Sequence, residues 1–409
     1  MRGRFSVAGL ASLGFAALLG AATTLPAAAS GPADAAGAYI VILADSTDAG
    51  SVAHEHARSY GADVGHVYRH ALRGYSAHLS GRAVSRIAAD RRVAAVQPDG
   101  VVTTTAQTMP TGINRIDAEL SPTAAIDGVD TRVNVDVAVI DTGVDLDHPD
   151  LNVNRPGARN CSTGNSADDG NGHGSHVAGT IGALDNSVGV VGVAPGARIW
   201  PVRVLNNAGS GSWADVICGI DYVTANASQI EVANMSLGGS GSDSTCGSNA
   251  DALHEAICGS VAAGVTYAVA AGNSSSNANG FVPATFAEVI TVSALADFNG
   301  QPGGGAAATC RSDVDDTLAD FSNYGADVDL IAPGVCILSS WKGGGFSTIS
   351  GTSMASPHVA GGAALYKATH PSASPSSVKT ALQAAGNTNW NNVDDRDGIK
   401  ESLLNVATF

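Results

Sequence analysis

The stretch GTSMASPHVAGG, residues 351–362, places Ser353 among small residues, shortly before the apolar run 359–366. Pro357 suits the first turn of a helix, because the N–H that it lacks would have no intrahelical partner there. Ser353 is therefore expected at a helix N-terminus, where unpaired backbone N–H groups stabilise negative charge. The alternative is a Gly/Ser/Pro turn that only caps the helix. Ser353 is a candidate nucleophile only if a base and a carboxylate elsewhere in the chain accompany it.

Strand-like apolar segments alternate with helical patterns through the region around this stretch. The segments expected as strands are 135–140, 198–205, 232–237, 265–270, 289–294 and 328–332. The segments expected as helices are 173–183, 214–225, 250–263, 359–369 and 375–385. This alternation predicts an α/β fold, with a parallel β-sheet, helices on both of its faces, and sites at the carboxyl ends of its strands.

A smaller domain is expected before it. Residues 38–97 follow a βαββαβ pattern, which is typical of a small α+β ferredoxin-like domain, and the threonines 103–105 predict a flexible exit from it. The charge changes at this boundary: residues 30–105 hold 7 Arg and 7 Asp or Glu, whereas residues 106–409 hold 12 Lys or Arg and 30 Asp or Glu. The smaller segment carries 5 of the 11 His, which are expected on its solvated surface. A pH-sensing role is the alternative, because His titrates near neutrality.

Residues 1–29 have the pattern of a secretory signal peptide. Arg2 and Arg4 precede the apolar stretch 10–19, and the alanines 27–29 form an A-x-A cleavage site. A membrane anchor is the alternative, but the apolar run is short and broken by glycines. No later stretch is long and uncharged enough to span a bilayer, so we expect a secreted, extracellular protein, monomeric and without a membrane partner. The net charge of −16 argues against a nucleic-acid partner, which would normally require a basic surface.

Export makes the six cysteines candidates for disulfide bonds. Cys246 and Cys258 are close enough in sequence to close a small loop, and Cys310 with Cys336 is the second expected pair. Cys161 and Cys218 are left over. Cys218 falls in an apolar helical pattern, which predicts a free buried thiol.

Two further motifs lie at a strand end and a helix start. Asp141, in VIDTGVDLDHPDL, follows the strand 135–140, where a carboxylate shielded from water can orient an imidazolium; an Asx-turn or helix cap is the alternative. His173, in DDGNGHGSHVAGT, begins a glycine-rich helix that a substrate can approach closely. The alternative for His173 and His176 is a metal-binding pair, but no HExxH motif and no Cys or carboxylate ligand at suitable spacing accompanies them.

Taken together, the DTG, HGSHVAGT and GTSMASPHVAG motifs in the order Asp, His, Ser resemble those of the subtilisin-like serine proteases, the subtilases, over residues 106–409. Residues 30–105 resemble the inhibitor-type propeptide of such proteases. The resemblance implies a serine endopeptidase that acts on polypeptides and is made as a zymogen. Its own propeptide would serve as chaperone and inhibitor, and self-processing would leave Ala106 at the new N-terminus.

The same resemblance assigns catalytic roles. Ser353 would be the nucleophile, His173 the general base and acid, and Asp141 the residue that orients His173. Asn273, in AVAAGNS, matches the asparagine that stabilises the oxyanion together with the Ser353 backbone N–H. Without the resemblance, Asn273 is a plain turn residue.

Substrate contacts follow from the resemblance as well. It implies two strand edges that hold an extended peptide between them by backbone pairing. They are Ser236, Leu237 and Gly238 on one side, and Gly209, Ser210 and Gly211 on the other. Ala271 and Gly272 would line the pocket for the residue before the cleaved bond, with Phe281 near its base. Trp213 would wall a more distant apolar pocket, or else belongs to the core.

A structural Ca²⁺ is the implied cofactor. The stretch LDNSVGVVGV, residues 184–193, resembles the calcium loop of subtilisins, and oxygen-only ligands suit this ion. The matching ligands are Gln107, Asp150, Asn186 and the carbonyl groups of Leu184, Val188 and Val190. A second, weaker cation site is expected near Asp329, with carbonyl groups from residues 284–289.

Two other functions remain open at this point. One is a binding or inhibitory protein that kept the fold and lost catalysis, although none of the catalytic residue types has been replaced. The other is a metal hydrolase that uses His173 and His176. The sequence leaves side-chain preference of the substrate open in every case.

Overall fold

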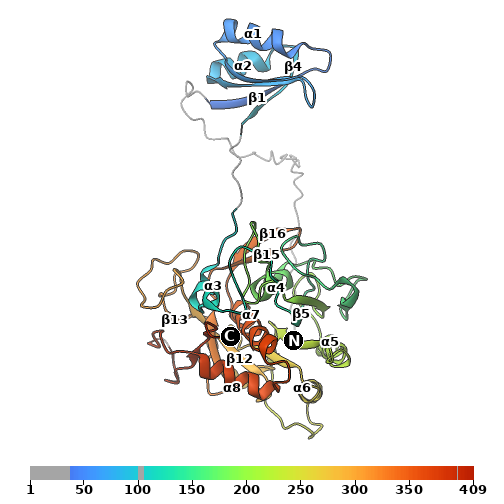
Figure 1. Cartoon of the computed structure of the whole chain (residues 1–409), viewed down its shortest axis with the longest axis vertical. Coiled ribbons are helices and arrows are strands. Elements are labelled where there is room, and N and C mark those ends of the chain that lie inside the picture. The colour runs from blue at the N-terminus through green and yellow to red at the C-terminus, as the bar shows by residue number, and fades with distance from the viewer. Residues whose placement is uncertain (1–36, 100–105, 394) are drawn as a thin grey trace, which may run out of the picture. The chain divides into compact units, whose positions relative to one another are not determined.

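A computed structural model describes residues 37–99, 106–393 and 395–409, and the chain divides into two compact units, residues 1–104 and 105–409 (Figure 1). The predicted signal peptide and the threonines 103–105 lie outside the described residues. Within the described ranges, every helix is too short or too polar to cross a lipid bilayer.

The first unit has the predicted βαββαβ order. Its elements are β1 (Gly37–Leu43), α1 (Ala49–Tyr60), β2 (Asp63–Tyr68), β3 (Gly74–Leu79), α2 (Gly81–Ala88) and β4 (Val93–Pro98). The four strands form an antiparallel sheet in the order β2-β3-β1-β4, and the two helices cover one face of it (Figure 1). The core includes Val41, Tyr75, Leu79 and Ile87, which are all fully buried. The expected ferredoxin-like domain is confirmed.

One histidine of this unit is not on the surface, contrary to expectation. His56 is 0% exposed, because it lies on the inward face of α1 with Val52 and Ala53. Its Nδ1 is 2.6 Å from the Tyr75 hydroxyl and its Nε2 is 3.0 Å from Asp90. These two polar partners make burial of an imidazole tolerable. The other four histidines are exposed, as expected.

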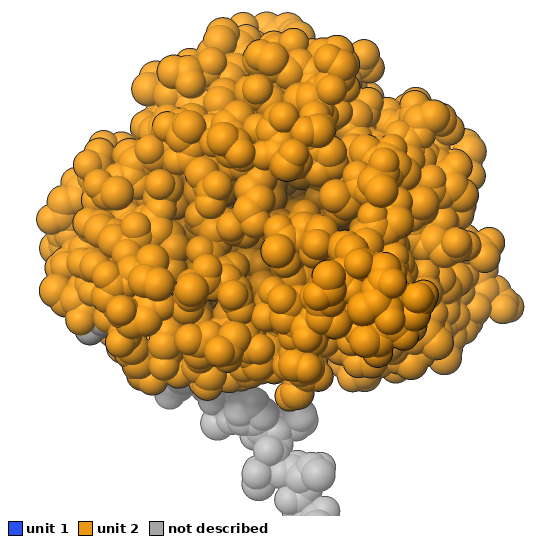
Figure 2. Space-filling model, turned by 90° about the horizontal axis from the view of Figure 1, so that it is seen from below, with its two compact units in different colours: residues 1–104 blue, residues 105–409 orange. Residues whose placement is uncertain are grey.

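The second unit is built on a nine-stranded sheet in the order β17-β14-β12-β10-β8-β5-β7-β6, with β13 paired antiparallel to β12. All other pairings are parallel. Its strands are β5 (Asp136–Asp141), β6 (Arg159–Asn160), β7 (Arg198–Arg203), β8 (Ile230–Met235), β10 (Thr266–Ala270), β12 (Ile290–Ala296), β13 (Thr317–Leu318), β14 (Leu330–Pro333) and β17 (Ser402–Leu403). Figure 2 shows this unit alone in orange.

Helices cover both faces of this sheet (Figure 1). They are α3 (Thr111–Arg115), α4 (His173–Gly182), α5 (Trp213–Ala225), α6 (Ala252–Ala262), α7 (Thr352–Thr369) and α8 (Pro375–Ala385). Side chains alternate along each strand, so Val137 and Val139 of β5 pack with α4, α7 and α8, whereas Ala138 and Ile140 pack with α5 and α6. Burial on both faces explains the continuous apolar strands, and the predicted subtilisin-like α/β fold is confirmed.

Shorter elements complete the unit. Two small antiparallel pairs join β9 (Gly239–Ser240) to β11 (Phe281–Val282), and β15 (Ile337–Trp341) to β16 (Gly345–Ile349). Short 3₁₀ turns occur at Ala118–Leu120, Arg155–Gly157 and Ala278–Gly280.

Three disulfide bonds are present. Cys246–Cys258 and Cys310–Cys336 are the expected pairs. The expected free thiol at Cys218 is wrong, because Cys218 is bonded to Cys161. The Cys161 backbone N–H donates to the Arg203 carbonyl at 2.8 Å, which continues the pairing of β6 with β7 and brings Cys161 beside α5.

Candidate active site

Asp141 and His173 meet at the carboxyl end of β5. Asp141 is the last residue of that strand and 0% exposed, while His173 is the first residue of α4. The Asp141 Oδ1 accepts hydrogen bonds from the His173 Nδ1 and the Thr142 backbone N–H, both at 2.7 Å. Burial alone would lower the pKa of His173, but the adjacent Asp141 carboxylate offsets this and raises it above the usual value. The pair stabilises an imidazolium.

A glycine allows the close approach of α4 to β5. A Cβ on Gly174 would collide with the carbonyl group of Gly143 in the loop after β5. Gly174 is therefore required for close packing between α4 and the end of β5, in addition to the role in substrate access that the sequence suggested.

Asp169, which the sequence analysis did not select, organises the loop before His173. Its Oδ1 accepts from the Thr142 hydroxyl and from the backbone N–H groups of Asn171 and Gly172, at 2.8–2.9 Å. Its Oδ2 accepts from the backbone and the hydroxyl of Ser175. Asp169 also contributes to the raised pKa of His173. Its position before a glycine-rich helix start was the only signal in the sequence, and many loop aspartates share it.

Ser353 is the second residue of α7 and is coupled to Ser236. The Ser353 Oγ donates to the Ser236 carbonyl at 3.2 Å, and the Ser236 hydroxyl donates to the Ser353 carbonyl at 2.7 Å. In the described residues, no direct hydrogen bond joins Ser353 to His173. Catalytic hydrogen bonds are often loose without substrate, so this geometry is compatible with a nucleophile and its base.

Pro357 lies further inside the helix than expected. The helix begins at Thr352, five residues before Pro357, so the prediction of a first-turn proline was wrong. In a regular helix, the N–H of residue 357 would bond to the carbonyl of residue 353. Because proline lacks that N–H, the Ser353 carbonyl remains available to the Ser236 hydroxyl.

Asn273 follows β10 and faces the same helix start. Its Oδ1 accepts from the backbone N–H of Thr352 at 2.8 Å and from the Thr352 hydroxyl at 2.9 Å. Its Nδ2 has no hydrogen-bond partner in the described part of the chain. The buried Asn323 supports this turn, because it donates to the Ala271 carbonyl at 2.8 Å and accepts from the Ser274 backbone N–H. Asn323 was not identified from the sequence.

The predicted substrate residues line two adjoining cavities. The larger, of about 660 Å³, contains His173 and both expected edges. The smaller, of about 260 Å³, contains Ser353 and Asn273 together with Phe281. Ser236, Leu237 and Gly238 border both cavities; Gly209, Ser210 and Gly211 border the larger, and Ala271 and Gly272 the smaller. Trp213 is 39% exposed and also lines the larger cavity, so it is not a core residue.

His176 does not share a ligand position with His173. Its ring is fully buried and its Nε2 is 2.9 Å from the Ile337 carbonyl, whereas His173 is turned toward Asp141. Burial lowers the pKa of His176 to about 3. Since the two imidazoles are held by separate partners, the alternative of a chelating pair is wrong.

The residues that carry the expected calcium ligands contact one another. Asp150 is 1% exposed, and its carboxylate contacts the Asn186 side chain at 2.8 Å and the Val190 backbone N–H at 2.9 Å. The Gln107 side-chain amide lies 2.6 Å from the Leu184 carbonyl and 3.2 Å from that of Val190. Val188 contacts the Asn186 side chain through its backbone N–H. Burial raises the pKa of Asp150, so an oxygen-rich pocket with one buried carboxylate fits a Ca²⁺ ion.

At the expected second cation site, near Asp329, the structure has a lysine side chain. The ammonium group of Lys379, from α8, lies 2.8 Å from the Asp329 carboxylate. It also donates to the carbonyl groups of Ala287 and Val289, at 3.2 and 2.8 Å. A side-chain cation therefore occupies the position at which we expected a metal ion.

Comparisons with known proteins agree with this arrangement. Residues 133–399 match the profile of the subtilase family, and residues 38–105 match that of peptidase inhibitor I9. An alkaline protease of Alkalihalobacillus alcalophilus is 38% identical over 333 residues, which cover 81% of this chain and 74% of the relative. Subtilisin E of Bacillus subtilis (strain 168) is 39% identical over 313 residues, or 76% of this chain and 74% of the relative. The solved structure of a cold adapted subtilisin-like serine proteinase covers 74% of this chain and 99% of its own, at 34% identity and a TM-score of 0.52.

Proposed function

Because this chain belongs to the subtilase family and is a serine endopeptidase, we propose that Ser353, His173 and Asp141 form its catalytic triad. The observation that carries the proposal is the 2.7 Å hydrogen bond between the buried Asp141 and the His173 Nδ1, beside cavities that also hold Ser353. This bond keeps a proton on Nδ1, so Nε2 is free to act as a base.

Peptide hydrolysis then proceeds in two halves. The Ser353 Oγ attacks the carbonyl carbon of the substrate while His173 takes the hydroxyl proton, and the C–N bond breaks as His173 passes that proton to the leaving amine. The acyl group remains on Ser353. Water attacks this ester with His173 again as the base, which releases the carboxylic acid and the free serine.

Two donors would stabilise the oxyanion that forms in each half. The Asn273 Oδ1 is held by Thr352, which leaves its Nδ2 to donate toward the substrate carbonyl. The backbone N–H of Ser353, in the first turn of α7, is the second donor. Removal of one such donor costs about 3–4 kcal/mol of transition-state stabilisation, a magnitude measured on subtilisin itself.

Polypeptides are the proposed substrates. An extended segment fits between Gly209–Gly211 and Ser236–Gly238, whose backbone groups border the larger cavity. Pairing with backbone gives affinity with little dependence on side chains. The smaller cavity, walled by Ala271, Gly272 and Phe281, would receive the residue before the cleaved bond.

A secreted zymogen is the proposed form of synthesis. The inhibitor domain of residues 38–105 precedes the protease domain, and the chain would be cut by its own protease between Thr105 and Ala106. The propeptide would then act as chaperone and inhibitor of its own protease, which would be a monomer outside the cell.

A structural Ca²⁺ is the proposed cofactor. Gln107, Asp150 and Asn186, with the carbonyl groups of Leu184, Val188 and Val190, would hold it, and its charge would compensate the buried Asp150. The ion would stabilise the fold and take no part in peptide hydrolysis.

Replacement of the nucleophile tests the proposed function. Ser353→Ala should accumulate as the uncleaved precursor in a protease-free host and should not react with a serine-directed fluorophosphonate. Ser312→Ala is the matched control, because Ser312 is exposed, and it should mature and react normally. Normal maturation of Ser353→Ala would contradict self-processing, and its labelling by the fluorophosphonate would contradict the choice of nucleophile.

A further inference from the structure

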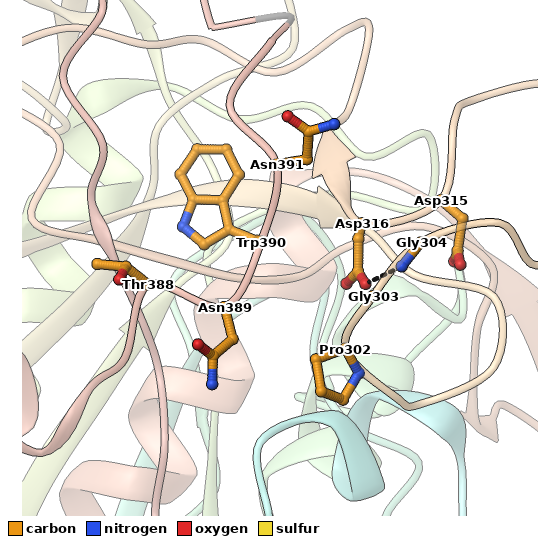
Figure 3. Close-up of a pocket in the computed structure, with 9 residues that line it drawn as sticks. All are labelled: Pro302, Gly303, Gly304, Asp315, Asp316, Thr388, Asn389, Trp390 and Asn391. Carbon is orange, nitrogen blue, oxygen red and sulfur yellow. Dashed lines mark hydrogen bonds between the residues drawn. The ribbon is translucent and has the colours of Figure 1, made fainter.

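The cavity beside Trp390, of about 390 Å³, lies outside the active site, and its carboxylates are already paired (Figure 3). Asp316 accepts hydrogen bonds from the Arg115 guanidinium and from the Gly304 backbone N–H, both at 2.7 Å. Each oxygen of Asp315 accepts from a backbone N–H at 2.9 Å. Because the chain supplies a donor to every carboxylate oxygen here, this cavity does not require a cation.

Four side chains between β9 and β12 form a different kind of group. Cys246, His254, Cys258 and Glu288 each place one possible ligand atom within 4.8 Å of the other three. Among the described residues, no other set of three or more His, Cys, Asp or Glu side chains comes together in this way. Two sulfur atoms, an imidazole nitrogen and a carboxylate oxygen are ligand types of tetrahedral zinc sites. The group therefore has the composition of a zinc site.

His254 is held in the manner of a metal ligand. It is 2% exposed, and its ring stacks on Phe286 with the centroids 4.0 Å apart. Its Nδ1 lies 2.7 Å from the Ser244 hydroxyl, while its Nε2 faces Glu288 at 2.7 Å and the Cys246 Sγ at 4.0 Å. Histidine ligands usually have the second ring nitrogen fixed by such a hydrogen bond. Nε2 is therefore the nitrogen that is oriented to bind an ion.

The Glu288 carboxylate faces a sulfur atom that has no proton to donate. Cys246 is bonded to Cys258, yet the Glu288 Oε1 lies only 3.1 Å from the Cys246 Sγ. The other oxygen, Oε2, is the one that contacts His254. The disulfide bond does not explain this position of a carboxylate, whereas a cation bound to the sulfur and the imidazole would attract it.

This disulfide bond is open to reduction. Cys246 is exposed and Cys258 is half-buried. The two cysteines are 12 residues apart, compared with 26 and 57 for the other two bonds, and the shortest loop contributes least to stability in the chain-entropy model. Exposed disulfide bonds are typically the labile ones. A small reductant can therefore reach and open it.

We propose that Cys246, Cys258, His254 and Glu288 bind a Zn²⁺ ion once their disulfide bond is reduced. The reductant, a thiol or a phosphine, supplies two electrons and becomes a disulfide or, with an oxygen atom from water, a phosphine oxide. The two sulfur atoms take up protons, which Zn²⁺ then displaces into the solvent. His254 binds through Nε2 as the tautomer with its proton on Nδ1, where the Ser244 hydroxyl accepts it.

The geometry of the chain permits this exchange. Zn–S bonds of about 2.3 Å in a tetrahedral site place two sulfur atoms about 3.8 Å apart, which side-chain rotation can reach with the Cα atoms 5.9 Å apart. The four ligands leave no open position, so the ion is structural. It replaces the link between Cys246 and α6 that reduction removes, and it adds Glu288 to that link.

Zinc binding by the reduced full chain tests the proposal, with Ser353→Ala to prevent self-digestion and CaCl₂ present throughout. After treatment with the phosphine TCEP, one equivalent of Zn²⁺ should remain bound per chain on gel filtration, measured by atomic emission, and the oxidised protein should lack that equivalent. Zinc should slow the reaction of Cys246 and Cys258 with iodoacetamide by about 10-fold or more without slowing that of Cys310 and Cys336. Peptide mass spectrometry identifies each modified cysteine.

Variants of the reduced protein provide the controls. Cys246→Ser should lose the zinc equivalent, whereas Cys310→Ser, which removes a cysteine outside the group, should keep it. Glu288→Gln retains all six cysteines, so its folding does not depend on a lost bond, and it should bind zinc about 10-fold or more weakly. Zinc at about 100-fold excess over its dissociation constant should raise the melting temperature of the reduced protein by about 5 °C.

Several results would overturn the proposal. A zinc equivalent that persists in Cys246→Ser, or that the oxidised protein binds equally well, belongs to another site. Equal zinc affinity with and without Glu288→Gln excludes the carboxylate as a ligand. A reduced chain that zinc neither stabilises nor protects from iodoacetamide has no such site, and equal protection of Cys310 and Cys336 would show that the effect of zinc is not specific to this group.

Discussion

At the scale of single residues, the site depends on side chains that touch no substrate. Asp169 accepts five hydrogen bonds around the start of α4, and Asn323 holds the turn that presents Asn273. The motifs predicted the residues that we propose act directly, because those residue types follow from the chemistry. The supporting residues could not be predicted, since their role depends on contacts made only after the chain has folded.

The substitution Asp169→Asn tests whether a supporting residue affects the position and the pKa of His173. The amide keeps the shape of the side chain, but its N–H₂ would meet the backbone N–H and the hydroxyl of Ser175, which are donors as well. The start of α4 should therefore shift and misplace His173, and kcat/KM should fall by about 10-fold or more. Loss of the negative charge also makes the imidazolium less stable and lowers the pKa of His173. The acidic limb of the kcat/KM profile should therefore move to lower pH.

The neighbouring Asp168→Asn is the matched control, because Asp168 is exposed and its carboxylate, among the described residues, accepts one hydrogen bond, from the Leu146 backbone N–H at 3.2 Å. Its pH profile should coincide with that of the unchanged enzyme. A profile for Asp169→Asn that keeps its acidic limb, at whatever rate, would mean that Asp169 has no electrostatic effect on His173.

At the scale of elements, local patterns predicted the helices and strands but not all of the links between them. Apolar periodicity indicated β5, β8 and β10, because burial on both faces leaves a continuous run of apolar residues. The bond between Cys161 and Cys218 spans 57 residues and depends on where β6 pairs in the sheet. Cysteine spacing contains no information on that pairing, so only the two short-range bonds were predictable.

The link between α8 and the sheet through Lys379 leads to the second prediction. Lys379→Ala removes the ammonium donor from the Asp329 carboxylate and from two carbonyl groups, and the Thr291 backbone N–H remains as a donor to that carboxylate. Burial already raises the pKa of Asp329. The free energy of unfolding should fall by about 1–3 kcal/mol. Potassium or sodium ions should restore part of it by entering the vacated position, whereas choline at equal ionic strength should not. Urea denaturation in each salt measures both effects.

Lys379→Arg serves as the comparison, because it retains a positive charge with several donors in a different shape. It should lose less stability than Lys379→Ala and show no specific response to potassium. An equal response of the unchanged protein and Lys379→Ala to potassium would contradict the idea that the ammonium replaces a metal ion.

At the scale of the whole molecule, the sequence predicted the two folds and their order along the chain. The βαββαβ pattern and the strand–helix alternation were sufficient, because each predicts a sheet with a defined set of buried positions. His56 shows where such prediction ends. Its burial depends on Tyr75 and Asp90, which are distant in sequence, and a histidine on a short helix is more often exposed.

The first unit has little stability to lose, and this gives the last prediction. Its core contains 11 buried apolar residues, and domains of this size rarely have more than about 3–5 kcal/mol of stability. His56→Ala removes a fully buried ring and leaves the Tyr75 hydroxyl without its partner, at a cost of about 2–4 kcal/mol. The propeptide should then be largely unfolded and unable to guide folding of the protease.

We expect maturation of the full chain, after dilution from denaturant, to become slower by about 10-fold or more. Gel electrophoresis of samples taken over time measures this rate. His54→Ala, two residues away and exposed, should mature at the unchanged rate. Equal rates for both variants would show that the protease folds without its propeptide, because the substitution acts on the first unit alone.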